Sequence, residues 1–71
     1  MTLSTEQQIK MLAAYKGISQ SEIARLIDVS PQSLSNRIRR GTLTRDDLNK
    51  IAKAVGAEYE AVFKFSDGTI I

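Results

Sequence analysis

The 71-residue sequence contains neither cysteine nor histidine. Without cysteine it can form no disulfide framework and no thiolate metal site, and without histidine it lacks the other usual zinc ligand. Histidine is also the commonest general base, so hydrolytic chemistry would depend on carboxylates alone. The sequence also has no glycine-rich loop that could hold a phosphate group. We therefore expect a protein that is not an enzyme and that binds no metal and no cofactor.

Long hydrophobic runs are absent as well. No apolar stretch approaches the roughly 18 residues of a membrane-spanning helix, and the N-terminal region lacks the apolar segment of a signal peptide. These absences predict a cytoplasmic protein with no membrane partner. A chain of 71 residues makes one domain, near the lower size limit for a self-sufficient hydrophobic core.

The net charge of +2 is small, but the charge is unevenly distributed. A cluster of arginines falls within nine residues, at Arg37, Arg39, Arg40 and Arg45. Two of the eight acidic residues, Glu58 and Glu60, lie by contrast in the tail. A local basic patch on a nearly neutral protein indicates a polyanionic partner that binds at one face.

Two helix starts lie close together in the middle of the chain. Ser19 and Glu22 have the spacing of a capping box, in which each side chain bonds the other residue's backbone N–H. Ser30 followed by Pro31 is the second start, because proline needs no N–H at the first helical position. Residue 28 between the helices requires a left-handed backbone, which aspartate tolerates better than most residues.

The apolar residues of these two helices predict how they pack. Ile23, Ala24 and Ile27 form one stripe, and Leu34 and Ile38 form another with helical spacing. Two such short helices can bury both stripes only if they cross, and the small alanine allows a close approach. This arrangement is a helix-turn-helix. Its second helix presents polar residues outward, namely Gln32, Ser33, Asn36, Arg39 and Arg40.

The whole chain is predicted to be mainly α-helical, with helices at about 5–16, 20–27, 31–40 and 45–55. The first helix begins with either a Ser4/Gln7 or a Thr5/Gln8 capping box. Beyond residue 57 the period changes to two, with an aromatic face on a strand over about 58–65, a turn at 66–68 and a short return strand. Because Val62 breaks the alternation, a fifth short helix over 58–63 is the alternative.

The motif residues together resemble a known family. The segment Gln20-x-x-Ile23-Ala24, the segment Val29 to Ser35 and a glycine after the next helix are similar to the lambda and 434 phage repressor and Cro family, the XRE-like helix-turn-helix regulators. The resemblance covers about residues 6–56 and implies a compact four-helix domain that binds double-stranded DNA with the helix at 31–40 in the major groove. Three features depart from the family pattern: Asp28 stands at the turn glycine, the helix at 31–40 is one residue longer, and a strand replaces the fifth helix.

The resemblance implies that Gln20 contacts a phosphate and that residues early in the helix at 31–40 read bases. The full set of expected DNA contacts is Gln20, Ser30, Gln32, Ser33, Asn36, Arg37, Arg39 and Arg40. Amide side chains such as those at 32 and 36 can bond adenine in a bidentate way. The two arginines at 39 and 40 could instead serve only the helix dipole, and the one at 37 could pair with an acid.

The expected function is sequence-specific DNA binding by a small transcriptional regulator, most simply a repressor. Such proteins commonly bind as two-fold pairs, so we expect a homodimer. The residues expected to hold it together form the aromatic face of the tail, Tyr59, Ala61, Phe63 and Phe65. A protein-interaction module, such as an antitoxin or adaptor that uses this same aromatic strand, is the alternative function.

Overall fold

The computed structural model describes residues 4–71 and contains four helices followed by a small antiparallel hairpin. The helices are α1 (Thr5–Lys16), α2 (Gln20–Leu26), α3 (Pro31–Arg40) and α4 (Arg45–Ala54). The strands are β1 (Ala57–Tyr59) and β2 (Phe63–Phe65). The predicted fold class, mainly α with a C-terminal hairpin, is therefore confirmed.

Local sequence signals set the ends of the helices. Capping boxes begin α1, α2 and α4 at Ser4, Ser19 and Thr44, and the first of these uses Gln7 rather than the Thr5/Gln8 alternative. Asp28 has a φ of 66°, the left-handed backbone expected between α2 and α3. Its N–H and that of Val29 donate to carbonyls of α2, so the helix ends in a Schellman motif with aspartate in place of glycine.

The core joins all four helices to the tail. Leu34 of α3 and Ile23 of α2 are fully buried, as the crossing of their stripes requires, and Val29 packs partly buried against the same core. The complete buried apolar set is Ile9, Leu12, Ile23, Ala24, Ile27, Leu34, Ile38, Leu48, Ile51, Ala52, Val55, Phe63, Phe65 and Ile71. A core that draws on both ends of the chain makes the tail an integral part of the domain.

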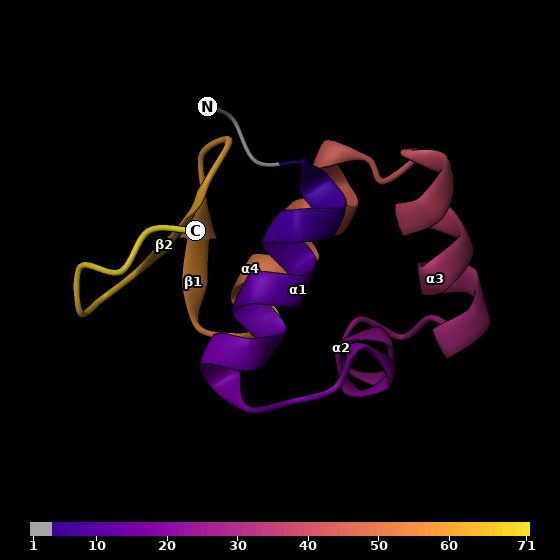
Figure 1. Cartoon of the computed structure of the whole chain (residues 1–71), viewed down its shortest axis with the longest axis horizontal. Helices are drawn as coiled ribbons and strands as arrows, with labels where there is room; N and C mark the ends of the chain where they lie inside the picture. The colour runs from indigo at the N-terminus through magenta and orange to yellow at the C-terminus, as the bar shows by residue number, and fades with distance from the viewer. Residues whose placement is uncertain (1–3) are drawn as a thin grey trace.

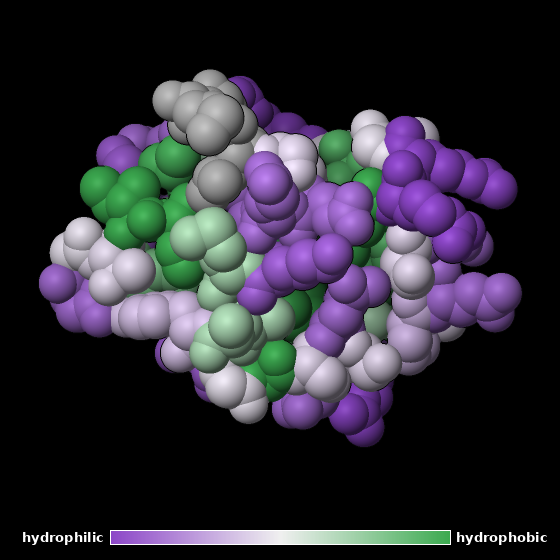
Figure 2. Space-filling view, in the orientation of Figure 1, coloured by the Kyte–Doolittle hydropathy of each residue, from purple (hydrophilic) through white to green (hydrophobic). Residues whose placement is uncertain are grey.

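The elements are arranged along the longest axis of the molecule, which spans 31 Å. Figure 1 shows α1 in the middle with α4 behind it, α2 beneath, α3 at one end and the hairpin at the other. The DNA-reading helix that the sequence predicts and the C-terminal sheet are therefore on opposite sides of the domain. Figure 2 shows strongly hydrophilic side chains projecting at the α3 end and more hydrophobic surface at the hairpin end.

The single strand predicted over 58–65 is wrong, and so is its alternative, a fifth helix. The chain reverses at residues 60–62, where Ala61 takes a left-handed φ of 67° and the Glu60 N–H donates to the Val62 carbonyl. The two halves then pair as β1 and β2, with Glu58 opposite Lys64. The break in the alternation at Val62 was thus the sign of a tight turn.

The predicted turn at 66–68 and the return segment after it are present. Gly68 donates to the carbonyl of Phe65, and Phe65 donates to the carbonyl of Thr69. Phe63 and Ile71 exchange two backbone hydrogen bonds, of 2.7 and 2.9 Å. The last residues of the described chain therefore add a third segment beside β2, and the buried Ile71 side chain closes the core at this edge.

The aromatic residues of the tail do not form a free face. Phe63 is completely buried and Phe65 is 8% exposed, both inside the chain's own core. Tyr59 is half-buried, with its ring 5.0 Å from that of Phe63, and Ala61 lies in the turn. The phenylalanines are therefore not available to a second copy or to a partner protein, because the hydrophobic core of the same chain already holds them.

Candidate nucleic-acid interface

The outward face of α3 forms a shallow polar groove. Ser30 opens it at the N-terminal end of α3, where its hydroxyl accepts a 3.0 Å hydrogen bond from the Ser33 N–H. Because Leu34 and Ile38 point into the core, the opposite side of α3 is directed to solvent. The residues that line the groove are Ser30, Gln32, Ser33, Asn36, Arg37, Arg40 and Thr42.

Six of the eight predicted DNA contacts are thus brought together in one groove. Gln20 and Arg39 are the two that do not line it. Gln20 is the first residue of α2 and half-buried, whereas Arg39 is exposed on the last turn of α3. Arg39 still belongs to the same surface, because its guanidinium Nη2 donates a 2.6 Å hydrogen bond to Oδ1 of the groove residue Asn36.

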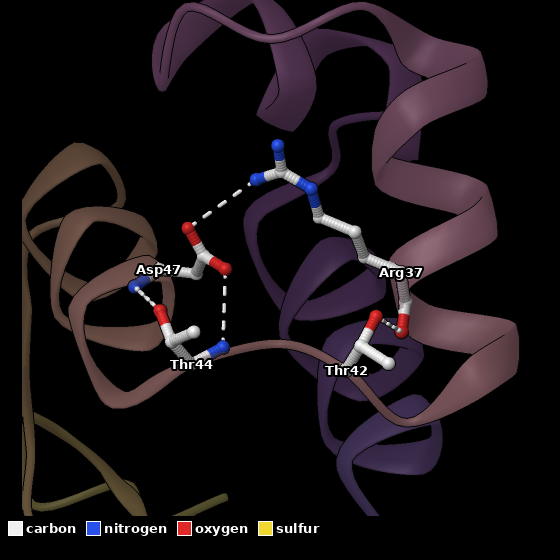
Figure 3. Close-up of polar contacts among 4 residues, drawn as sticks. All are labelled: Arg37, Thr42, Thr44 and Asp47. Atoms are coloured by element: carbon white, nitrogen blue, oxygen red, sulfur yellow. Dashed lines mark hydrogen bonds and ion pairs between the residues drawn. The ribbon is translucent and has the colours of Figure 1, made fainter.

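Arg37 has a structural partner, which the sequence suggested as an alternative to DNA contact. Its guanidinium Nη1 lies 3.4 Å from Oδ1 of Asp47, so the pair connects α3 to the first turn of α4 (Figure 3). The other carboxylate oxygen of Asp47 accepts from the N–H of Thr44 in the capping box. The Arg37 charge is therefore partly compensated, whereas Arg40 is exposed and makes no ion pair with any residue of the described chain.

Thr42 is a groove residue that the sequence reasoning missed. It follows Gly41, which ends α3 with a φ of 67°. The Thr42 N–H donates a 2.9 Å bond to the carbonyl of Arg37 and folds the chain back toward the groove, and the hydroxyl lies 3.5 Å from the same carbonyl (Figure 3). The signal was present in the sequence, because a glycine that ends a helix brings the next residue back over the last turn.

The fold and this groove define a helix-turn-helix protein. α2 and α3 cross over a shared buried seam, a sharp left-handed turn separates them, and the second helix carries the exposed polar face.

In the part of the chain that is described, no helix has both the length and the apolar character needed to cross a membrane.

The comparisons with known proteins agree with this class. The model of a helix-turn-helix family matches residues 9–61, which is most of the chain. The chain therefore belongs to the XRE-type, lambda-repressor-like helix-turn-helix family of DNA-binding regulators. It is also similar to repressor protein CI of Enterobacteria phage phi80, with 34% identity over 53 residues. The alignment covers 75% of this chain but only 22% of that repressor. No solved structure gives a significant match.

Proposed function

We propose that this chain binds double-stranded DNA in a sequence-specific manner, as a small transcriptional regulator, with α3 in the major groove. The observation that carries the proposal is the polar groove on α3, which gathers two amides and two arginines on the side of the helix away from Leu34 and Ile38. Family membership supports DNA binding independently, because the helix-turn-helix family model covers residues 9–61, which include α2 and α3.

The chemistry of the groove suits base reading flanked by phosphate binding. The major groove admits an α-helix, and base edges there present distinct patterns of donors and acceptors. Gln32 and Asn36 lie one turn apart on the same side of α3, where their amides can meet neighbouring bases. Arg40, at the C-terminal end, supplies an exposed cation for the phosphate backbone. Gln20 at the start of α2 is proposed as a further phosphate contact.

Repression is the proposed regulatory outcome. It rests on the similarity to a protein named as a repressor, of which this chain spans about a fifth. A promoter-reporter assay that carries the selected binding site should show lower expression when the chain is present. Higher expression would make the protein an activator and leave the DNA-binding proposal intact.

Two copies are proposed to act on one operator. A single helix-turn-helix reads few base pairs, and pairs of such domains usually bind half-sites about one helical turn, roughly 34 Å, apart. The buried phenylalanines of the tail cannot form the contact between the copies, and the sheet lies at the end of the domain away from α3 (Figure 1). Sedimentation on a saturated duplex should give two chains per duplex; one chain per duplex would contradict this proposal.

The experiment that tests DNA binding is selection from a pool of random duplexes, followed by gel shifts at increasing salt. We expect enrichment of a defined site and an affinity that falls steeply with salt, because phosphate contacts release counterions. Lys64→Ala is the control for net charge, because it removes one positive charge at the hairpin end, where Lys64 pairs with Glu60. It should bind the selected site as the wild type does. A protein that enriches no duplex but forms a stable complex with another protein would favour an interaction module instead.

A further inference from the structure

The two amide side chains of the α3 groove, Gln32 and Asn36, differ in their hydrogen bonds. Oδ1 of Asn36 accepts a 2.6 Å hydrogen bond from Nη2 of Arg39, one turn further along the helix. Such charge-assisted bonds are shorter and about twice as strong as bonds between neutral groups. A guanidinium has only donors, so the atom that faces it must be the oxygen of the amide. The bond therefore turns the oxygen of the Asn36 amide toward Arg39.

Gln32 provides the contrast. Its side chain is exposed, and within residues 4–71 the amide forms no hydrogen bond. It is free to turn either its oxygen or its nitrogen toward a base. The two amides share a helix face and a groove but do not present the same groups.

This difference matters for the choice of base. An amide that recognises adenine donates from its nitrogen to N7 and accepts at its oxygen from the N6 amino group. Guanine presents only acceptors in the major groove, N7 and O6. With one lone pair of Oδ1 engaged by Arg39, Asn36 keeps both Nδ2–H donors free, and a base amino group would have to share the oxygen with a guanidinium.

We propose that Arg39 is a positioning residue that fixes Asn36 as a donor and makes it select guanine, whereas Gln32 remains able to select adenine. The proposal rests on the proposed function, because it assigns the base specificity of the same DNA-binding surface. It gives Arg39 a role that phosphate anchoring or a favourable contact with the helix dipole would not give it. Those two roles change affinity and stability, but they do not change which base is preferred.

The test compares the base preferences of variants by selection from one random duplex pool. Asn36→Ala first identifies the base pair that Asn36 reads, as the position whose preference is lost. Arg39→Ala then releases Oδ1, and we expect the preference at that position to move from guanine toward adenine by about tenfold. The position read by Gln32, identified in the same way with Gln32→Ala, should not change. Arg40→Ala is the matched control, because Arg40 is a neighbouring exposed arginine with no bond to Asn36.

The outcomes separate this inference from the function on which it rests. If the wild type selects a site but prefers adenine at the Asn36 position, or if Arg39→Ala leaves guanine preferred there, the positioning role is overturned and DNA binding stands. The same conclusion follows if Arg40→Ala shifts the preference as much as Arg39→Ala does. If the wild type enriches no duplex at all, the proposed function fails, and the inference fails with it.

Discussion

The guanidinium of Arg37 lies 3.4 Å from the carboxylate of Asp47 and joins α3 to the start of α4 (Figure 3). Asp47 also accepts a 3.0 Å bond from the Thr44 N–H, so this carboxylate both caps α4 and holds α3 against it. The Arg37 side chain is 40% exposed and that of Asp47 is 14% exposed. Solvent therefore screens the ion pair, and the cap is the stronger of the two interactions.

We predict that Asp47→Ala lowers the free energy of unfolding by about 1–2 kcal/mol, because it removes the bond from the Thr44 N–H to the Asp47 carboxylate and also the ion pair with Arg37. Arg37→Ala should cost less than about 1 kcal/mol, as expected for a partly exposed pair. Urea denaturation of the variants measures both values. Asp46→Ala is the control, since it removes a neighbouring carboxylate on the same helical turn without breaking the cap. Equal losses for Asp46 and Asp47 would show that only the helix dipole matters.

The seam between α2 and α3 should dominate stability. Leu34 is fully buried in this seam, so Leu34→Ala removes apolar contacts and leaves a cavity at a cost of about 2–5 kcal/mol. The matched control is Leu26→Ala, because Leu26 is the same residue type but 57% exposed, and its loss should cost about 0.5 kcal/mol or less. Thermal melting compares the two. A Leu34 variant that melts within a degree or two of the wild type would contradict the packing of α3.

The contact between α1 and the final turn should depend on pH. The Tyr15 hydroxyl donates to Asp67, and this bond, with help from the Thr69 N–H, lowers the pKa of Asp67 from 3.8 to about 2. Since the folded-state pKa is depressed, the stabilisation is complete above about pH 4 and is lost as the pH falls toward 2.

Tyr15→Phe tests this dependence while it keeps an aromatic ring whose centroid lies 4.7 Å from that of Phe65. We expect the variant to be less stable than the wild type at pH 7, and we expect the difference to shrink between pH 4 and pH 2. Titration of the Asp67 carboxyl by NMR should show a higher pKa in the variant. An unchanged pKa would mean that the tyrosine does not hold this carboxylate.

The local parts of the fold could be predicted from the sequence because their signals are local. The capping residues, Pro31 and the spacing of Leu34 and Ile38 each act within one or two helical turns, and the helices lie where these signals place them. Even the left-handed Asp28 follows from the short distance between two helix starts. The polar face of α3 is a consequence of the same periodicity, which is why six of the eight expected contacts line one groove.

Long-range interactions could not be predicted in this way. The spacing of Thr5 and Gln8 allows a capping box, yet Gln8 is 5% exposed and its Nε2 donates to the carbonyls of Ala61 and Ile71. These partners are more than fifty positions away, and nothing near Gln8 in the sequence indicates them. What covers the aromatic face of the tail could not be predicted for the same reason. Alternation showed that Phe63 and Phe65 share a face, but only the packed fold shows that the chain's own core holds it.

Base reading and phosphate anchoring should be separable on α3, and this is the prediction that bears most directly on the proposed function. Gln32→Ala or Asn36→Ala removes an amide that is proposed to meet a base edge, so each should lose about 1–3 kcal/mol on the selected site and little on random duplex. Arg40→Ala removes an exposed cation at the end of α3, so it should weaken both duplexes alike and reduce the salt slope by about one unit. Gel shifts on the two duplexes at several salt concentrations measure these effects, with Lys64→Ala as the charge-matched control at the far end of the domain. Equal losses on selected and random DNA for all three α3 variants would contradict the assignment of a reading face, because a surface that only attracts phosphates has no means of telling the two duplexes apart.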